Sequence, residues 1–218
     1  MTTIRKVSYQ NICLFDDKSI EAKNALKDFI YYLKASGRTG ILNFSYSGGV
    51  NSLHPHLSIK DNLILDAIPK SFIKSNVDNF FGIINELQNK SLKLLLESLE
   101  DLDYKVKDLS LDDINLVSLI KTLLSGQEDL FLLNPGLNLS KNNIDIIKDA
   151  IEFEVYSNHK NVFIKSQNKE LWFDITTHFI SINEDKTFSK VSNPLKGLNK
   201  ISSSFSPTYD FTLIKRSS

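Results

Sequence analysis

The chain has a single cysteine, no excess of charge of either sign and no long apolar run. Cys13 is the only cysteine among the 218 residues, which excludes an internal disulfide framework and suggests a reducing compartment. The 26 Lys and Arg residues balance the 26 Asp and Glu residues, so net positive charge gives no support for nucleic-acid binding. No apolar run reaches the roughly 18 residues that cross a bilayer, and the first ten residues lack a signal-peptide stretch. These absences predict a soluble, cytoplasmic protein.

The composition that remains is that of an ordinary globular protein. Hydrophobic residues make up 41% of the chain and charged residues 24%, which excludes disorder as the main state. The length suits one domain, or a core domain with a small appended subdomain. After Asn193 the composition shifts to Ser, Pro, Thr and Asn. We therefore expect a domain at 1–192 and an extended tail at 193–218.

The hydrophobic pattern alternates between strands and helices. Strands are predicted at short apolar runs, and helices where apolar residues recur three or four positions apart. The expected strands are 4–15 (one or two), 41–46, 130–133, 162–165 and 179–182. The expected helices are 19–34, 59–67, two or three pieces within 69–104, 114–124, 142–153 and 169–176, with Ser58 and Ser140 as N-caps. This alternation predicts an α/β fold whose sheet is covered by helices.

Several segments occur in the order seen in the ATP-binding cassette (ABC) ATPases. Residues 54–62 read HPHLSIKDN and resemble the segment that follows the family's Q-loop. Residues 105–110 read KVKDLS and resemble the approach to the family signature LSGGQ. The helix expected at 111–124 has the length of the helix that follows this signature in the family.

The second half of the chain continues the resemblance. Residues 130–134 read LFLLN and fall where the family has its Walker B strand, four apolar residues and an aspartate. Residues 163–167 fall on the switch-histidine strand, and 175–186 resemble the closing strand and turn. The resemblance covers roughly residues 40–190 and rests on order and spacing. It implies a P-loop NTPase-like fold, a mainly parallel sheet flanked by helices, with a helical subdomain inserted at about 67–109.

The family's phosphate-binding motif, G-x-x-x-x-G-K-[ST], is absent from this sequence. The nearest remnant is Asp16-Asp17-Lys18-Ser19, which stands about where the family has its lysine. Two carboxylates there would repel a triphosphate and fill the space that the motif's glycines keep open. Two interpretations stay open: a P-loop that has degenerated around Lys18, or a deleted P-loop and an acidic N-cap that complements the helix dipole.

The other positions that contact nucleotide in the family also carry different residues here. By the resemblance, Gly49 takes the place of the Q-loop glutamine, and Ser110 belongs to a signature that continues with two aspartates. Asn134 replaces the Walker B aspartate, and Gln167 replaces the switch histidine. The general-base glutamate is either replaced by Pro135 or deleted. Neither Pro135 nor Gln167 can exchange a proton near neutral pH. The resemblance thus implies a vestigial nucleotide site without catalytic residues, at Lys18, Ser19, Gly49, Ser110, Asn134 and Gln167.

Three other patterns in the sequence allow a different interpretation. Residues 124–127 read LSGQ and spell the signature more closely, but they lie directly before a buried strand, so position favours 109–110. His54 and His56 alternate as metal ligands would, yet no third ligand with suitable spacing is visible, so no metal or other cofactor is expected. Trp172 is expected to pack on the sheet edge, with a contact surface as the alternative.

The phosphate-binding loop, the magnesium-binding carboxylate, the general base and the switch histidine are all lost together. This predicts a domain whose role depends on its fold and not on catalysis. Phosphoryl transfer depends on positioning and charge neutralisation, and each contributor is missing here. The leading hypothesis is a non-catalytic subunit, structural or regulatory, of an ABC-transporter-type or other membrane-associated complex. The alternatives are a weakly ATP-binding or ATP-hydrolysing subunit and an unrelated protein-binding adaptor.

The resemblance also implies where a partner would bind. In the family, a permease contacts the ATPase domain beside the Q-loop. The resemblance therefore implies a partner surface formed by the helix at 66–81 together with Leu53, His54, Pro55, His56 and Leu57. The expected partner is a membrane permease or an active ABC ATPase, and a dimer is also compatible with the resemblance. The chain would then be cytoplasmic and reach the inner face of a membrane through that partner.

Overall fold

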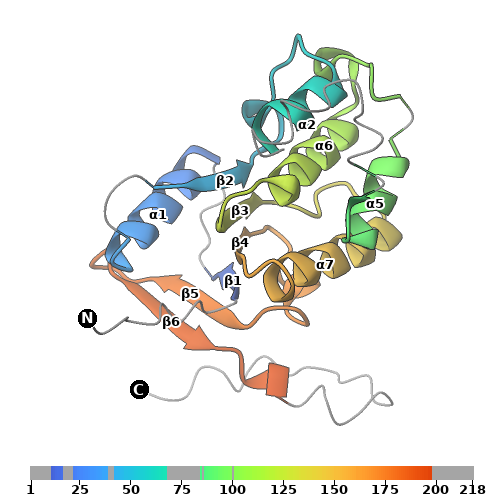
Figure 1. Cartoon of the computed structure of the whole chain (residues 1–218). Coiled ribbons are helices and arrows are strands. Elements are labelled where there is room, and N and C mark those ends of the chain that lie inside the picture. Colours follow the sequence, from blue (N-terminus) through green and yellow to red (C-terminus); the bar gives the residue numbers. More distant parts are fainter. Residues whose placement is uncertain are drawn as a thin grey trace, which may run out of the picture.

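The computed structural model describes residues 11–16, 22–38, 42–67, 84, 86–99 and 101–197. Its centre is a six-stranded sheet in the order β2-β3-β4-β1-β5-β6 (Figure 1). Strands β1 to β5 run parallel to their neighbours, and β6 pairs antiparallel with β5. The strands are β1 (Ile12–Phe15), β2 (Phe44–Ser47), β3 (Asp129–Leu133), β4 (Asn161–Lys165), β5 (His178–Ile182) and β6 (Phe188–Ser192).

The central strands β1, β3 and β4 are buried almost throughout. Their side chains meet helices on both faces, which is why their apolar runs are continuous rather than alternating. The strands predicted at 130–133, 162–165 and 179–182 are confirmed, each beginning one residue earlier than expected. Strand β6 has no such run. Its sequence, FSKVS, has only two apolar residues, and the strand is a mostly exposed edge of the sheet.

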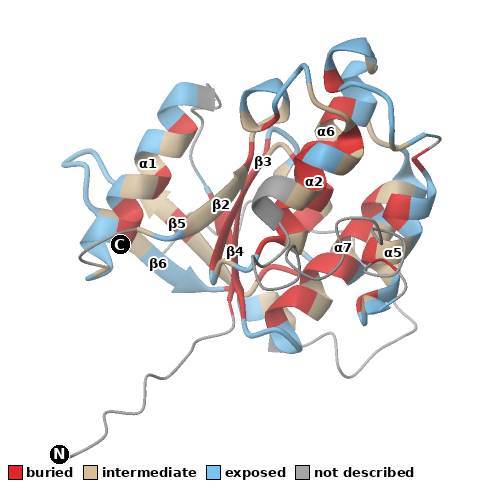
Figure 2. Cartoon of the chain, turned by 45° about the horizontal axis from the view of Figure 1, so that its top comes forward, coloured by how far each residue is buried: buried red, intermediate tan, exposed pale blue. Residues whose placement is uncertain are grey.

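Helices cover both faces of the sheet (Figure 2). Helix α1 (Ala22–Ala35) packs on one face, and α2 (Ile59–Ala67), α5 (Lys90–Glu97), α6 (Leu111–Leu124) and α7 (Lys141–Tyr156) pack on the other. The predicted caps are confirmed, since the Ser58 hydroxyl accepts from the Asp61 amide at 3.0 Å and the Ser140 hydroxyl from the Asn143 amide at 3.2 Å. Within the described residues, no helix has both the length and the apolar character needed to span a membrane.

Two helix predictions are wrong in their extent. The predicted helical stretch 69–104 does not continue to its end, because residues 101–104 form turns after α5. The Leu102 and Tyr104 carbonyls instead accept hydrogen bonds from Lys60 and Ile59 at the start of α2. At 169–176 only a 3₁₀ turn, η3 (Lys169–Trp172), is helical.

The remaining differences lie at segment ends. Strand β2 begins three residues later and ends one residue later than its predicted range of 41–46. The predicted strand at 4–10, the helix start at 19–21 and most of the tail lie outside the described residues.

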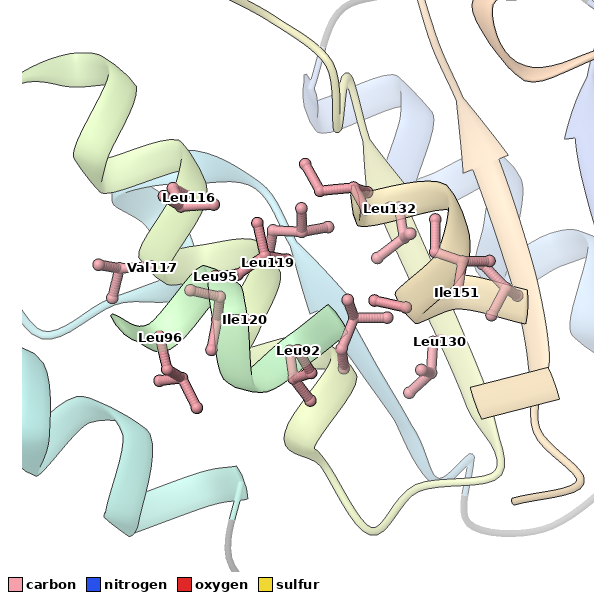
Figure 3. Close-up of a cluster of buried hydrophobic side chains, with 14 of the residues drawn as sticks. Leu92, Leu95, Leu96, Leu116, Val117, Leu119, Ile120, Leu130, Leu132 and Ile151 are labelled. Carbon is pink, nitrogen blue, oxygen red and sulfur yellow. The ribbon is translucent and has the colours of Figure 1, made fainter. Parts of the chain in front are cut away.

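One large apolar cluster joins the sheet to α5, α6 and α7 (Figure 3). Leu92, Leu95 and Leu96 of α5 are 1–2% exposed. Burying a leucine side chain stabilises a fold by roughly 1.5–3 kcal/mol. Helix α5 therefore shares its core with the sheet layer. The inserted subdomain at about 67–109 stays a prediction, since residues 68–83 lie outside the described part.

Candidate nucleotide site at the carboxyl edge of the sheet

The parallel strands β1 to β4 all end at the same edge of the sheet. In open α/β sheets, ligands bind outside the carboxyl ends of the strands, so this edge is the place to look for a nucleotide site. The residues that follow β1, β3 and β4 here are Asp16, Asn134 and Ser166. Two of the six predicted site residues, Lys18 and Ser19, lie outside the described residues.

Asn134 and Gln167 are brought together at this edge. The Asn134 backbone amide donates to the Lys165 carbonyl at 2.7 Å, and its side-chain oxygen accepts from the Gln167 backbone amide at 2.9 Å. Asn134 has φ 48°, a left-handed conformation that asparagine tolerates better than most residues. The Asn134 side-chain oxygen thus bridges the ends of β3 and β4.

Replacing Asn134 with alanine should lower the free energy of unfolding by about 1–2 kcal/mol, because a hydrogen bond is lost and the left-handed backbone becomes costlier. Asn134→Asp keeps the side-chain acceptor and should stay within about 0.5 kcal/mol of the wild type. Urea unfolding of the three proteins measures both values. An alanine variant as stable as the wild type would show that this bridge contributes nothing.

The lysines at this edge are held in ion pairs with acidic side chains. Lys165, the last residue of β4, has a 2% exposed side chain whose ammonium lies 3.3 Å from the Asp28 carboxylate on α1. The same ammonium lies 5.9 Å from the centre of the Phe15 ring. The Lys169 ammonium lies 2.8 Å from the Asp16 carboxylate after β1. Each of these two cations therefore faces a carboxylate of its own chain.

The sequence analysis did not identify Lys165 or its partner Asp28 as site residues. The sequence shows a lysine at the end of a predicted buried strand, and a buried ammonium requires a partner. This pattern could have identified Lys165. Its partner could not be identified in the same way, because Asp28 and Lys165 are 137 positions apart in the chain.

A shallow hollow of about 490 Å³ lies beside these groups. It is lined by Gln167, Asn168, Lys169, Glu170 and Phe173, so one ammonium and one carboxylate face it. Trp172 lies behind it, fully buried, with its indole N–H 3.3 Å from the Ser166 hydroxyl. The predicted packing of Trp172 is confirmed, and the alternative of a contact surface at Trp172 is wrong.

Gly49 and Ser110 both lie at the amino-terminal part of α6. The Ser110 hydroxyl accepts from the Asp113 amide at 3.2 Å and donates to the Asp113 carboxylate at 2.7 Å, so it caps α6. Gly49 has φ 61°, and a Cβ there would come within 2.9 Å of the Asn115 side-chain oxygen. These contacts give both residues a structural role, while a nucleotide contact stays a prediction.

The predicted partner surface is a fixed loop with an exposed tip. His54, Pro55 and His56 are exposed, Leu57 is half-buried, and Leu53 is buried with 7% exposure. The Asn62 side chain on α2 fixes this loop. Its oxygen accepts from the His54 amide at 2.7 Å, and its nitrogen donates to the His54 carbonyl at 3.1 Å. A partner can therefore reach 54–56 directly, whereas Leu53 can only support the loop.

No described residues form a metal site or an activated thiol. Within the described ranges, no three His, Cys, Asp or Glu side chains lie close enough together to hold a metal ion. Cys13 is fully buried in β1, and this burial raises the pKa of its thiol to about 12. A thiol with that pKa is protonated at neutral pH and is a poor nucleophile.

Comparison with known proteins identifies the fold. No known family profile and no curated protein sequence matches the chain. Among solved structures, an RNase-L inhibitor matches 88% of the chain with a TM-score of 0.57 and 14% identity, although the chain spans only 36% of its length. A dimeric ATP-binding cassette in a post-hydrolysis state, bound to ADP and phosphate, matches 84% of the chain and 86% of its own with a TM-score of 0.59 and 9% identity. The chain has the fold of the ABC ATPases.

A third solved structure supports the same assignment. It is described as an inward-facing ABC transporter of the metal-chelate type, and it matches 84% of this chain and 73% of its own with a TM-score of 0.54 and 13% identity. The expected P-loop NTPase-like fold is thus confirmed, and the resemblance to the ABC ATPases has structural support. At these identities the likeness establishes the ABC fold alone. The carboxyl edge described above is the edge at which open α/β sheets bind their ligands.

Proposed function

We propose that this chain is a non-catalytic ABC ATPase-like subunit, a pseudo-ATPase that acts as a structural or regulatory component of a transporter-type or other membrane-associated complex. The observation that supports this most is the bonding at the carboxyl edge. There the Asn134 side chain bonds the Gln167 backbone, and Lys165 and Lys169 pair with carboxylates of the same chain. The polar and charged groups at this edge are thus engaged with one another.

Binding a triphosphate at this edge would be electrostatically unfavourable. The carboxylates of Asp16 and Asp28 lie beside the two lysines and would repel the phosphates unless they moved away. Hydrolysis would face a further obstacle, because losing a single transition-state donor typically costs about 2.7–4 kcal/mol. Asn134, Pro135 and Gln167 supply neither a magnesium-binding carboxylate nor a general base.

The proposed role is to bind other proteins. The exposed tip at 54–56 is held rigidly by Asn62, which suits a docking surface for a membrane permease or an active ABC ATPase. The structural neighbours include a transporter and a dimeric cassette, and both are consistent with assembly. In this role the chain would be cytoplasmic and would reach a membrane through its partner.

Titration with Mg-ATP tests the pseudo-ATPase part of the proposal. We expect isothermal titration calorimetry to detect no binding tighter than about 1 mM, which corresponds to roughly 4 kcal/mol, and a phosphate-release assay to stay at the buffer rate. A variant carrying Asn134→Asp and Gln167→His restores two of the family's side chains and should also stay inactive. Sub-millimolar binding that disappears in Lys18→Ala would support the alternative of an ATP-binding subunit instead.

Site-specific crosslinking tests the assembly part. A photo-crosslinking residue at His56 should capture a polytopic membrane protein or an intact ABC ATPase in cells, identified by mass spectrometry. The same residue at Lys186, in the exposed turn between β5 and β6, serves as the matched control and should not capture it. Capture of neither class at His56 would favour the unrelated adaptor.

A further inference from the structure

Helix α1 presents a row of three lysines to solvent. Lys23, Lys27 and Lys34 are all exposed. At 3.6 residues per turn their positions fall within about 40° of arc on the helix, opposite the buried residues Ala25 and Phe29. From first to last the row is about 16 Å long. These three residues, the α1 lysine row, therefore form one straight line on the outer face of the helix (Figure 2).

The charge of the α1 lysine row is not neutralised by neighbouring carboxylates. Within the described residues, none of the three lysines pairs with an acidic side chain. Asp28 is the one acidic residue in the sequence of α1, and its carboxylate pairs with the buried Lys165. The outer face of α1 therefore carries three positive charges that are free to attract an anion.

The negative charge that balances the chain lies elsewhere. The first turn of α6, for example, carries Asp112 and Asp113, and α6 covers the opposite face of the sheet from α1. Helix α1 alone is about 10 Å thick, whereas charges are screened over about 8 Å at physiological ionic strength. A surface that touches the outer face of α1 would therefore interact with the lysine row and not with these aspartates.

An exposed aromatic ring interrupts the row. Tyr31 is 50% exposed and lies between Lys27 and Lys34 in the sequence. The Lys27 ammonium lies 5.6 Å from the centre of the Tyr31 ring. Tyrosine has an apolar body and a polar tip, and it is enriched where proteins meet the headgroup region of a bilayer. The face thus combines cations with a side chain suited to that region.

The shape of this face favours a flat partner. An extended acidic peptide binds a groove or an open strand edge, and the outer face of a helix offers no strand edge. Neither the 490 Å³ hollow beside Gln167 nor a second hollow of about 510 Å³ beside β2 includes a residue of α1. A plane of anionic headgroups, by contrast, can contact every member of a straight row at once. The geometry therefore matches a bilayer better than a peptide.

We propose that the outer face of α1 binds the headgroups of an anionic lipid bilayer, with the helix lying along the membrane surface. Each lysine near such a surface strengthens binding about five-fold, so the row would contribute about 100-fold. This contact is weak by itself and would add to attachment through a membrane partner. It does not depend on the pseudo-ATPase role, because α1 covers the opposite face of the sheet from the loop-bearing helix α2.

Vesicle sedimentation of the full chain tests the proposal. Vesicles of phosphatidylcholine alone are compared with vesicles that also contain about 30% phosphatidylserine. We expect the partition coefficient to be at least about 20-fold larger for the anionic vesicles at physiological ionic strength. In about 1 M KCl the screening length falls to about 3 Å, and the preference should disappear.

Substitutions in the row make the test specific to α1. Lys27→Gln should weaken binding to the anionic vesicles about five-fold, and Lys27→Glu about 25-fold because it changes the charge by two units. Tyr31→Ser keeps all three charges and should weaken binding by less than Lys27→Glu does. Lys141→Glu makes the same charge change on an exposed lysine at the start of α7, across the sheet, and should bind like the wild type. Thermal unfolding confirms that each variant is folded.

The proposal is overturned if the chain binds both kinds of vesicle equally, or if Lys27→Glu and Lys141→Glu have the same effect. Polyglutamate and single-stranded RNA are assayed in parallel. If either binds through Lys27 while the anionic vesicles do not, the face serves an acidic protein or a nucleic acid instead. None of these results changes what a crosslinker at His56 captures, so this proposal and the proposed function can fail separately.

Discussion

Replacing Glu154 with alanine should lower the free energy of unfolding by about 3–5 kcal/mol, the usual cost of removing one partner of a buried ion pair. Glu154 lies on α7 with 3% exposure. Its carboxylate is 2.6 Å from the Lys160 ammonium and accepts from the Asn89 side-chain amide at 2.9 Å. Without it, a buried ammonium loses its counter-charge and Asn89 loses an acceptor.

The effect should be large because the buried cluster of Glu154, Lys160 and Asn89 joins three helices. Asn89 caps α5 by accepting from the Leu92 amide at 3.0 Å. Lys160 donates to the carbonyls of Leu123 and Ser125, both at 2.8 Å, at the end of α6. Glu154 connects both groups to α7. Losing Glu154 therefore weakens the packing of α5 and of the end of α6. It also leaves the Lys160 ammonium buried without its counter-charge.

Urea unfolding of Glu154→Ala, Glu154→Gln and Glu152→Ala separates the causes. Glu154→Gln keeps hydrogen-bonding atoms but loses the charge, so its cost should lie between those of the wild type and the alanine variant. Glu152 is on the same helix in a solvent-exposed pair with Lys196, 3.7 Å away, so its loss should cost less than about 1 kcal/mol. If Glu154→Ala and Glu152→Ala lower the free energy of unfolding by the same amount, the buried cluster stabilises the fold no more than the exposed pair does.

Replacing Arg38 with alanine should cost about 2–3 kcal/mol at pH 7, less than a fully buried pair because the Arg38 side chain is 38% exposed. Arg38 follows α1 and pairs with Asp129, the first residue of β3, whose side chain is 4% exposed. The Asn161 side chain donates a further hydrogen bond to Asp129 at 3.1 Å. Without Arg38, the Asp129 carboxylate stays buried near one neutral donor.

The cost of Arg38→Ala should depend on pH. Burial raises the pKa of the Asp129 carboxyl above its ordinary 3.8, and Arg38 opposes this rise. The folded state thus binds the proton more readily than the unfolded state, so this group's contribution to stability falls as pH rises from 3.8 through the folded pKa. Removing Arg38 raises that pKa further and enlarges the loss.

Urea unfolding of both proteins between pH 4 and pH 7 measures this dependence. The difference between wild type and Arg38→Ala should be largest at pH 7 and should shrink as the pH falls toward 4, because a growing share of the Asp129 carboxyl is then protonated in the folded state. Arg38→Lys keeps the positive charge and should retain most of the stability at pH 7. A difference that stays constant across the range would contradict the assignment to Asp129.

Much of the fold was predictable because its signals are local. The buried runs at 130–133 and 162–165 predicted the central strands, and Ser140 together with the helical spacing that follows it predicted the start of α7. The order of such segments predicted the ABC-like fold. The prediction was less accurate at 98–104, since the carbonyls there bond the start of α2, a contact that no local pattern encodes.

At the candidate site, the sequence by itself determined that the motif G-x-x-x-x-G-K-[ST] is absent, because residue identity needs no structure. The tertiary structure decided how the groups that remain are engaged. Lys165 pairs with Asp28 across 137 positions because α1 packs on the face of the sheet. Lys169 pairs with Asp16 across 153 positions because the sheet places β1 next to β4. Contacts between distant residues follow from strand order, which the chain acquires when it folds and which no short segment of it specifies.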